Sequence, residues 1–267
     1  MKVVDLGHGE PMVLIPGIQG RWEWMRPGVQ ALAGRCRVLT FSLADEPTAR
    51  YDGSAQGFDR YLDQIARALD GAGLQRAAIC GVSFGGLIAA AFAARHPERV
   101  SSLVLISALP PSWKLNERAM FYLRSPRLLA PVFCVSSLRL YREIAAAKPG
   151  FWNGVAGGIA HGANVIRHPF NAVRMARRAL MTPGLDWSGL DAVRVPTLVV
   201  TGEPSLDRVV PPAVTLDYLR LWPHAHHVTL PRTGHLGLIT RPAAFADIVS
   251  SFLDQNTQDA TARRLVG

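Results

Sequence analysis

Ser83 has the surroundings that point most clearly to chemistry, because it stands between glycines in the segment Gly81-Val82-Ser83-Phe84-Gly85. The apolar run from Ala77 to Cys80 predicts a strand before it, and the alanine-rich run 87–95 predicts a helix after it. A sharp turn between strand and helix strains the backbone of the serine and requires neighbours with almost no side chain. Glycine-rich turns of this kind also serve plain packing, but the strand and helix context favours a nucleophile.

His235 is the candidate general base, since it follows the last predicted strand in a loop that could reach over the sheet to Ser83. A histidine that takes the proton of a serine hydroxyl makes the oxygen a nucleophile toward carbonyl carbon. The other histidines fall in turns, in the middle of the chain or before the last strand, and we interpret them as solvated. His226 and His227 lack a carboxylate or cysteine at metal-ligand spacing, so no metal site is predicted.

Several acidic residues between Ser83 and His235 could orient the imidazole, and their position selects among them. The predicted strand 195–201 ends in the loop 202–211, which is where open α/β sheets place functional residues. Asp207 in this loop is the first candidate and Glu203 is the alternative. Asp207 also has a plain interpretation as a turn residue that caps the following segment.

The elements that must position these side chains alternate between strands and helices. Helical spacing of apolar residues predicts amphipathic helices over 58–69 and 245–253. Strands joined by helices imply a mostly parallel sheet covered on both faces. The first two strands are close enough in the chain to form a hairpin. The predicted strands are Val3 to Leu6, Met12 to Pro16, Cys36 to Ser42, Ala77 to Gly81, Val100 to Ala108, Val195 to Thr201 and His226 to Pro231.

The formal charge of +9 is concentrated in one middle segment. Between Pro111 and Leu185 stand eleven basic residues against Glu117 and Glu143, and the rest of the chain is neutral. Prolines cut this segment into short helical pieces, which predicts a small helical insertion. Its arginines could steer an anionic substrate or meet an acidic membrane surface, but solvated helix faces are the simpler interpretation. The charges form no continuous basic helix, so nucleic-acid binding is not expected.

The cysteines and the N-terminus bear on the cellular compartment. The 3 cysteines, Cys36, Cys80 and Cys134, are widely spaced in apolar surroundings, which predicts reduced core thiols. The first residues contain no apolar signal core, and no apolar run approaches the ~20 residues that span a bilayer. A soluble cytoplasmic protein is therefore expected.

The ordered motifs GVSFGG, PTLVVTGEPSLDRVVP and LPRTGH resemble those of the α/β-hydrolase superfamily over nearly the whole chain. The resemblance implies an eight-stranded, mostly parallel sheet with helices on both faces and a helical cap. The core would comprise residues 1–108 and 187–256, the cap 109–186, and a flexible tail 257–267. Ser83 would be the nucleophile, His235 the base, and Asp207 the residue that orients and stabilises the imidazolium.

The resemblance also implies an oxyanion hole, in which the amides of Ile18 and Phe84 hold the developing negative charge. The chain departs from the family pattern in three places. Pro16 replaces the histidine that commonly begins the oxyanion loop, two extra residues separate Glu203 from Asp207, and SLADEP at 42–47 replaces an Asp-x-Arg-Gly-x-Gly loop. Neither amide is removed by Pro16.

A serine with histidine and aspartate supports acyl transfer and needs no cofactor. The expected function is a carboxylic ester hydrolase acting on a small molecule through an acyl-enzyme. Lactone opening, carbon–carbon bond hydrolysis and acyl transfer remain open on the same fold, as does a non-catalytic ligand-binding protein. Trp22, Trp24, Phe121 and Tyr122 are the candidates for contacting substrate, although aromatic residues more often pack in cores. Membrane association is not expected, and the oligomeric state stays open.

Overall fold

The computed structural model describes the chain except residues 116, 129–139, 148–158, 160–161, 165 and 267. Seven strands form one sheet in the order β1-β3-β2-β4-β5-β6-β7. Their bounds are β1 Val4–Leu6, β2 Pro11–Ile15, β3 Arg37–Thr40, β4 Ala77–Val82, β5 Val100–Ile106, β6 Thr197–Thr201 and β7 His226–Thr229. Every pair is parallel except β1 with β3. The α/β-hydrolase sheet is confirmed, with seven described strands where the resemblance implied eight.

The predicted hairpin between the first two strands is wrong, because β3 lies between them. Val4 of β1 pairs with Thr40 of β3, whereas β2 pairs with β3 on one side and with β4 on the other. The apolar β2 is buried from Met12 to Ile15 and suits a central place. The short strand β1 is partly exposed and suits an edge, where Asp5 pairs with Arg37 at 2.7 Å.

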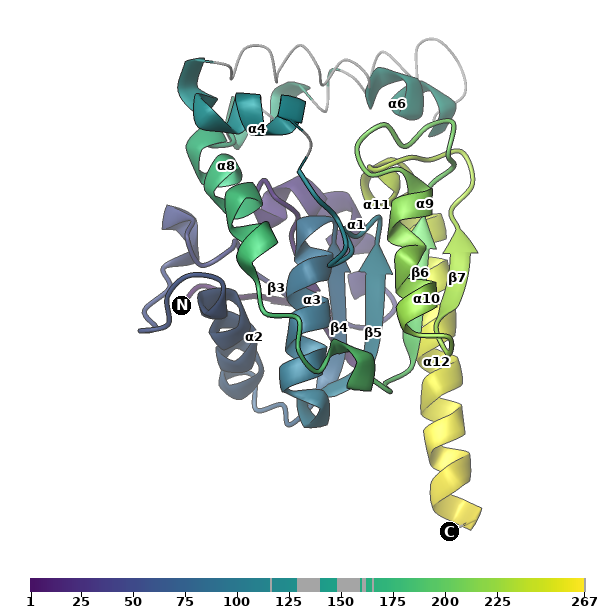
Figure 1. The fold of residues 1–267 in the computed structure, drawn as a ribbon. Coiled ribbons are helices and arrows are strands. Elements are labelled where there is room, and N and C mark those ends of the chain that lie inside the picture. The colour runs from purple at the N-terminus through teal and green to yellow at the C-terminus, as the bar shows by residue number, and fades with distance from the viewer. Residues whose placement is uncertain (116, 129–139, 148–158, 160–161, 165, 267) are drawn as a thin grey trace.

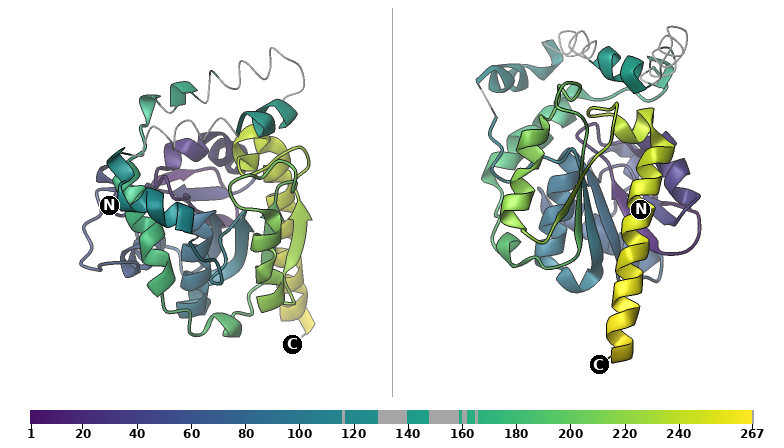
Figure 2. Two further views of the ribbon diagram at one scale, coloured as in Figure 1. Left: turned by 45° about the horizontal axis from the view of Figure 1, so that its top comes forward. Right: turned by 90° about the vertical axis from the view of Figure 1, so that its right-hand side faces the viewer.

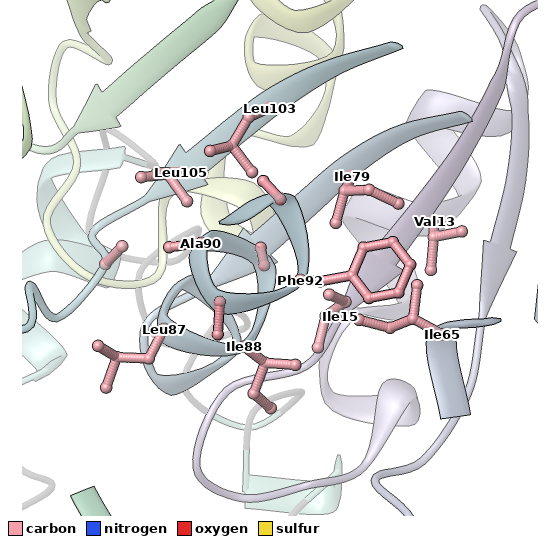
Figure 3. Close-up of a cluster of buried hydrophobic side chains, with 14 of the residues drawn as sticks. Val13, Ile15, Ile65, Ile79, Leu87, Ile88, Ala90, Phe92, Leu103 and Leu105 are labelled. Carbon is pink, nitrogen blue, oxygen red and sulfur yellow. The ribbon is translucent and has the colours of Figure 1, made fainter. Parts of the chain in front are cut away.

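Alternation along the strands sends side chains into two cores. In β4, Ala77 and Ile79 belong to one hydrophobic cluster, while Ala78 and Cys80 belong to the other. The first core contains α2 (Asp59–Gly71) and α3 (Phe84–Arg95), and Figure 3 shows part of it. The second contains α1 (Arg26–Ala33) and the first part of α12 (Pro242–Val266). Both faces of the sheet are therefore covered, as the strand and helix alternation predicted.

The last helix is longer than the sequence led us to expect. A flexible tail was expected over 257–267, whereas α12 continues to Val266 and extends past the sheet in Figures 1 and 2. The chain has neither glycine nor proline between Pro242 and Gly267, so nothing in the backbone chemistry interrupts the helix. None of the described helices combines the length and the apolar character needed to cross a membrane.

Short helices occupy the segment between β5 and β6. These are α4 (Glu117–Arg124), α6 (Tyr141–Ala147), α8 (Ala172–Met181), η5 (Thr182–Gly184) and η6 (Leu190–Ala192). Figures 1 and 2 show α4 and α6 over the edge of the sheet toward which the strand arrows point. Both helices belong to the segment 109–186, for which a cap stays a prediction. Cys134 lies outside the described residues, and Cys36 and Cys80 are buried free thiols.

The remaining short helices lie in the connections. They are η1 (Trp22–Met25), η2 (Pro47–Ala49), η3 (Pro97–Arg99), α9 (Pro212–Thr215), α10 (Asp217–Leu221) and α11 (Gly237–Thr240).

Candidate active site

Ser83 occupies the tight turn from β4 to α3, as the glycine pattern predicted. Its φ of 54° and ψ of −117° are unfavourable for a residue with a side chain and cost roughly 1–3 kcal/mol. The surrounding backbone holds it there, since its N–H donates to the Ile106 carbonyl at 2.8 Å and its carbonyl accepts from Gly86 N–H at 2.9 Å. The hydroxyl-bearing residue is only 6% exposed. Strain enforced by neighbouring backbone is typical of functional positions.

The flanking glycines permit the close approach of strand and helix. A Cβ atom on Gly81 would collide with the backbone of Gly85. A Cβ on Gly85 would lie 2.6 Å from the carbonyl oxygens of Ile15 and Pro16. Both positions therefore require glycine for space, with each φ in its ordinary negative range.

The acid loop and the histidine loop pack directly on each other. Glu203 N–H donates to the Thr233 carbonyl at 2.7 Å, and a Cβ on Gly234 would lie 2.8 Å from the Asp207 nitrogen. This packing brings Asp207 Oδ2 within 3.5 Å of His235 Nδ1. The pair is almost completely buried, with Asp207 3% exposed and His235 8% exposed. The structure thus brings together Asp207 and His235, which lie in two separate loops of the chain.

Asp207 is held in its ionised form. Its other oxygen, Oδ1, accepts hydrogen bonds from Val209 N–H at 3.0 Å and Val210 N–H at 2.9 Å. Burial acts to raise the pKa of Asp207, but the interaction with the His235 ring and these two N–H groups outweigh burial and lower it. A buried carboxylate beside Nδ1 can orient the ring and stabilise the imidazolium.

Glu203, the alternative acid, faces a different partner. Its Oε1 accepts a hydrogen bond from Arg232 N–H at 2.6 Å in an exposed setting. The two extra residues between Glu203 and Asp207 form a turn in which the Leu206 and Asp207 N–H groups both donate to the Glu203 carbonyl at 2.9 Å. This turn carries Asp207 back to His235, so the longer loop is compatible with Asp207 as the partner of the histidine.

The strand order places all these loops at one edge. β4, β5, β6 and β7 are consecutive parallel neighbours, so the turns after β4, β6 and β7 emerge on the same side. Ser83, Asp207 and His235 follow those strands. The carboxyl edge of an open α/β sheet is where such sheets bind and react with ligands.

The loop after β2 lies beside the serine. A Cβ on Gly17 would be 3.4 Å from Ser83 Cβ, so the loop that carries Gly17 and Ile18 comes close to Ser83. Phe84 is the first residue of α3, and its N–H has no acceptor within the helix. Phe84 directly follows Ser83 and Ile18 directly follows Gly17, and the role of their N–H groups as oxyanion donors stays a prediction.

Arg178 of α8 bonds to the loop that follows β2. It is 0% exposed, and its Nη1 donates to the Ile18 carbonyl at 2.7 Å. Its Nη2 donates to Asp45 Oδ1 at 2.8 Å and to Glu46 Oε1 at 2.6 Å. Arg174, one turn earlier, contacts the other Glu46 oxygen at 2.9 Å. The SLADEP segment thus has a definite role, because its two acids anchor arginines of the cap.

The predicted aromatic residues divide into three cases. Trp24 is buried and donates from Nε1 to the His168 carbonyl at 3.1 Å, while Trp22 lies under Arg26 with the guanidinium carbon 5.3 Å from the ring centroid. Phe121 on α4 is 63% exposed. The side chain of Tyr122 lies outside the described residues. Trp24 therefore joins the core to the cap, and contact with substrate stays a prediction for all four.

Sequence reasoning did not single out Arg178 or Glu143 as parts of the site. Glu143 is fully buried on α6 and accepts a hydrogen bond from Leu236 N–H, next to His235, at 2.7 Å. One available signal was the composition of the middle segment, in which Glu143 is one of two acids among eleven basic residues. Within the described part of the chain, no three His, Cys, Asp or Glu side chains gather as a metal site would require.

Comparison with known proteins agrees with this geometry. Residues 10–242 match the alpha/beta hydrolase fold family, and the chain belongs to this family. It is 27% identical over 272 residues to the 2-hydroxy-6-oxo-2,4-heptadienoate hydrolase of Pseudomonas putida F1, covering 93% of this chain and 91% of the relative. It is also 27% identical over 263 residues to the poly(3-hydroxyalkanoate) depolymerase of Ectopseudomonas oleovorans, covering 95% and 87%.

A solved esterase shows the same fold. The esterase EaEST of Exiguobacterium antarcticum superposes with a TM-score of 0.74 at 18% sequence identity, over 94% of each chain. The family membership and these relatives support hydrolase chemistry. These two relatives are named for different substrates, a heptadienoate and a poly(3-hydroxyalkanoate).

Proposed function

We propose that this protein is a serine hydrolase that cleaves a carboxylic ester of a small molecule through an acyl-enzyme. Ser83 is the nucleophile, His235 the general base and acid, and Asp207 the residue that orients the imidazole. The amides of Ile18 and Phe84 stabilise the oxyanion. The observation that carries the proposal is the buried Asp207–His235 pair, 3.5 Å apart, at the same sheet edge as the strained Ser83.

The proposed reaction has two halves. His235 takes the proton of Ser83 as the serine oxygen attacks the ester carbonyl, and the oxyanion forms against the two amides. The imidazolium returns its proton to the leaving alcohol, and the acyl group stays on Ser83. Water then attacks the acyl-enzyme with His235 again as base, which releases the carboxylic acid and restores the serine. The chain's own groups supply each proton transfer in this scheme.

Carbon–carbon bond hydrolysis is the second candidate, because the heptadienoate hydrolase matches nearly the whole chain. The same serine would attack a ketone carbonyl, and the two amides would stabilise the oxyanion. The leaving group would be a stabilised carbanion that His235 or water protonates. Lactone opening and acyl transfer to another alcohol or thiol would use the same acyl-enzyme. The proposal of ester cleavage draws support from the depolymerase relative as well, whose polymer name denotes an ester-linked acid.

The test is hydrolysis of p-nitrophenyl esters graded by acyl length, with 2-hydroxy-6-oxo-2,4-heptadienoate assayed in parallel. Ser83→Ala is expected to abolish turnover while the circular dichroism spectrum is retained. Ser250→Ala is the matched control, since that hydroxyl donates to the Asp247 carbonyl within α12, away from the proposed site. A fluorophosphonate probe is expected to label the wild type at Ser83. Tight ligand binding with no labelling would instead identify a non-catalytic binding protein.

The outcome also separates the two reactions. Turnover of esters with no loss of the dienoate would favour the ester hydrolase. Turnover of the dienoate at much higher kcat/KM than any ester would replace ester cleavage by carbon–carbon hydrolysis. Acylation of an added alcohol or thiol in place of water would identify a transferase.

A further inference from the structure

Glu143 is a buried carboxyl group at the histidine loop that the proposed reaction does not use. It lies on α6 of the basic middle segment and is 0% exposed. Its Oε1 accepts a hydrogen bond of 2.7 Å from the N–H of Leu236, the residue after His235. Its Oε2 is also buried, and it has no hydrogen-bond partner among the described residues. A carboxyl oxygen left without a donor in the interior is expensive and calls for an explanation.

The electrostatic surroundings of Glu143 tie it to the same centre. Burial raises its pKa to about 7, while the backbone N–H groups of Gly234 and Leu236 and the charge of His235 act to lower it. The negative charge of Asp207 raises it further. Among the described elements, α11 packs against α6, and its residues Gly237–Thr240 carry no titratable side chain. Among the described residues, His235 and Asp207 are the charged side chains that shift the pKa of this carboxyl.

We infer that Glu143 is a positioning residue of the active site, which holds the backbone that carries His235 and places a second carboxylate near the imidazole. This inference rests on the proposed function. When Ser83 gives its proton to His235, the neutral imidazole becomes a positively charged imidazolium, which a nearby carboxylate stabilises. Because Glu143 comes from the cap segment, the histidine is fully supported only when α6 is seated on the loop. The middle segment would thus contribute to proton transfer at His235.

Two substitutions of Glu143 distinguish a positioning role from simple packing, because they differ in whether the hydrogen bond to Leu236 N–H is kept. Glu143→Gln retains an oxygen that can accept from Leu236 N–H but cannot become negative. Glu143→Leu removes both the acceptor and the charge at similar volume. Glu117→Gln removes the other acid of the segment from an exposed position on α4 and is the matched control. It is expected to behave as the wild type.

The test is the ratio of wild-type to Glu143→Gln kcat/KM, measured with one p-nitrophenyl ester from pH 5.5 to 8.5. Below its pKa of about 7 the wild-type carboxyl is neutral, as glutamine is, so the ratio is expected near one. Above that pH the wild type carries the negative charge, and the ratio is expected to rise to about tenfold, which corresponds to about 1.4 kcal/mol. The change is expected in kcat more than in KM, because the residue acts on the imidazolium of the transition state.

A ratio that is constant across this pH range would overturn the electrostatic part of the inference, since a packing role does not depend on ionisation. Hydrogen exchange at the Leu236 amide tests the positioning part without requiring activity. Protection is expected to fall in Glu143→Leu and to persist in Glu143→Gln. Unchanged protection in both variants would show that Glu143 does not hold the loop. If the wild type neither turns over esters nor reacts with the fluorophosphonate probe at Ser83, the proposed function fails. Hydrogen exchange at the Leu236 amide then still tests whether Glu143 holds the loop.

Discussion

Replacing Arg178 by methionine tests how the cap and the oxyanion loop are held together. The guanidinium is fully buried and donates to Asp45, Glu46 and the Ile18 carbonyl at 2.8, 2.6 and 2.7 Å. Methionine fills much of the volume but leaves two carboxylates facing it. Removing one partner from a buried ion pair costs roughly 3–5 kcal/mol, because the remaining charge is uncompensated. Arg174 still contacts Glu46, so Asp45 bears most of this loss.

Urea unfolding followed by circular dichroism measures the effect. With a denaturant dependence of about 2–3 kcal/mol per molar urea, the midpoint is expected to fall by about 1–2 M. Arg177→Met is the matched control, since Arg177 is the adjacent exposed arginine on α8, and it is expected to change stability by less than about 0.5 kcal/mol. Adding Asp45→Asn and Glu46→Gln to Arg178→Met removes the orphaned charges and is expected to recover most of the loss.

Catalysis gives an independent readout of the same contact. Releasing the Ile18 carbonyl loosens the loop that carries one oxyanion amide. Complete loss of an oxyanion donor lowers kcat by about 10²–10³, so Arg178→Met is expected to lose at least about tenfold. A variant with wild-type stability and wild-type kcat would refute the role assigned to this network. Equal destabilisation by Arg177→Met would show that the effect belongs to the helix and not to the buried pairs.

Two further predictions concern the acids of the site. Asp207→Asn is expected to lower kcat by about 10⁴ with the fold retained, whereas Glu203→Gln is expected to leave kcat near the wild-type value. Steady-state kinetics on both variants check this. A large loss of kcat in Glu203→Gln and none in Asp207→Asn would transfer the role to Glu203. Glu143 is expected to make the protein less stable as pH rises from its ordinary pKa of 4.5 to about 7, because its raised pKa means that the unfolded chain releases the proton first. Urea midpoints at pH 5 and pH 8 measure this, and the drop between them is expected to be smaller in Glu143→Gln. An identical drop in both proteins would contradict the burial of this carboxyl.

Local pattern was sufficient for the parts of the fold that short segments define. The apolar run of β4, the following alanine-rich helix and the glycines around Ser83 predicted a strained turn, which the structure has. The parallel sheet also followed from strands separated by helices. These features depend on side-chain period and on steric limits within a few residues, and both can be read directly from the chain.

Contacts between segments that are distant in the sequence could not be predicted from local pattern. The hairpin expected for β1 and β2 failed because β3 competes for the same edge of β2, and the choice depends on burial across the whole sheet. Asp207 was only a ranked candidate until the acid loop and the histidine loop were seen to pack together. The roles of Arg178 and of SLADEP were not visible, since 132 residues separate Arg178 from Glu46.

The sequence by itself determined which residue types are available for catalysis, namely a serine, a histidine and a carboxylate, and which family the chain resembles. The tertiary structure decided which charged side chains are buried and therefore desolvated. Glu143 and Arg178 are ordinary members of a basic segment in the sequence, yet folding buries both against the loops that carry His235 and Ile18. Burial is what turns a charged side chain into a strong local influence, because electrostatic interactions strengthen as the dielectric falls, and burial is a property of the assembled chain alone.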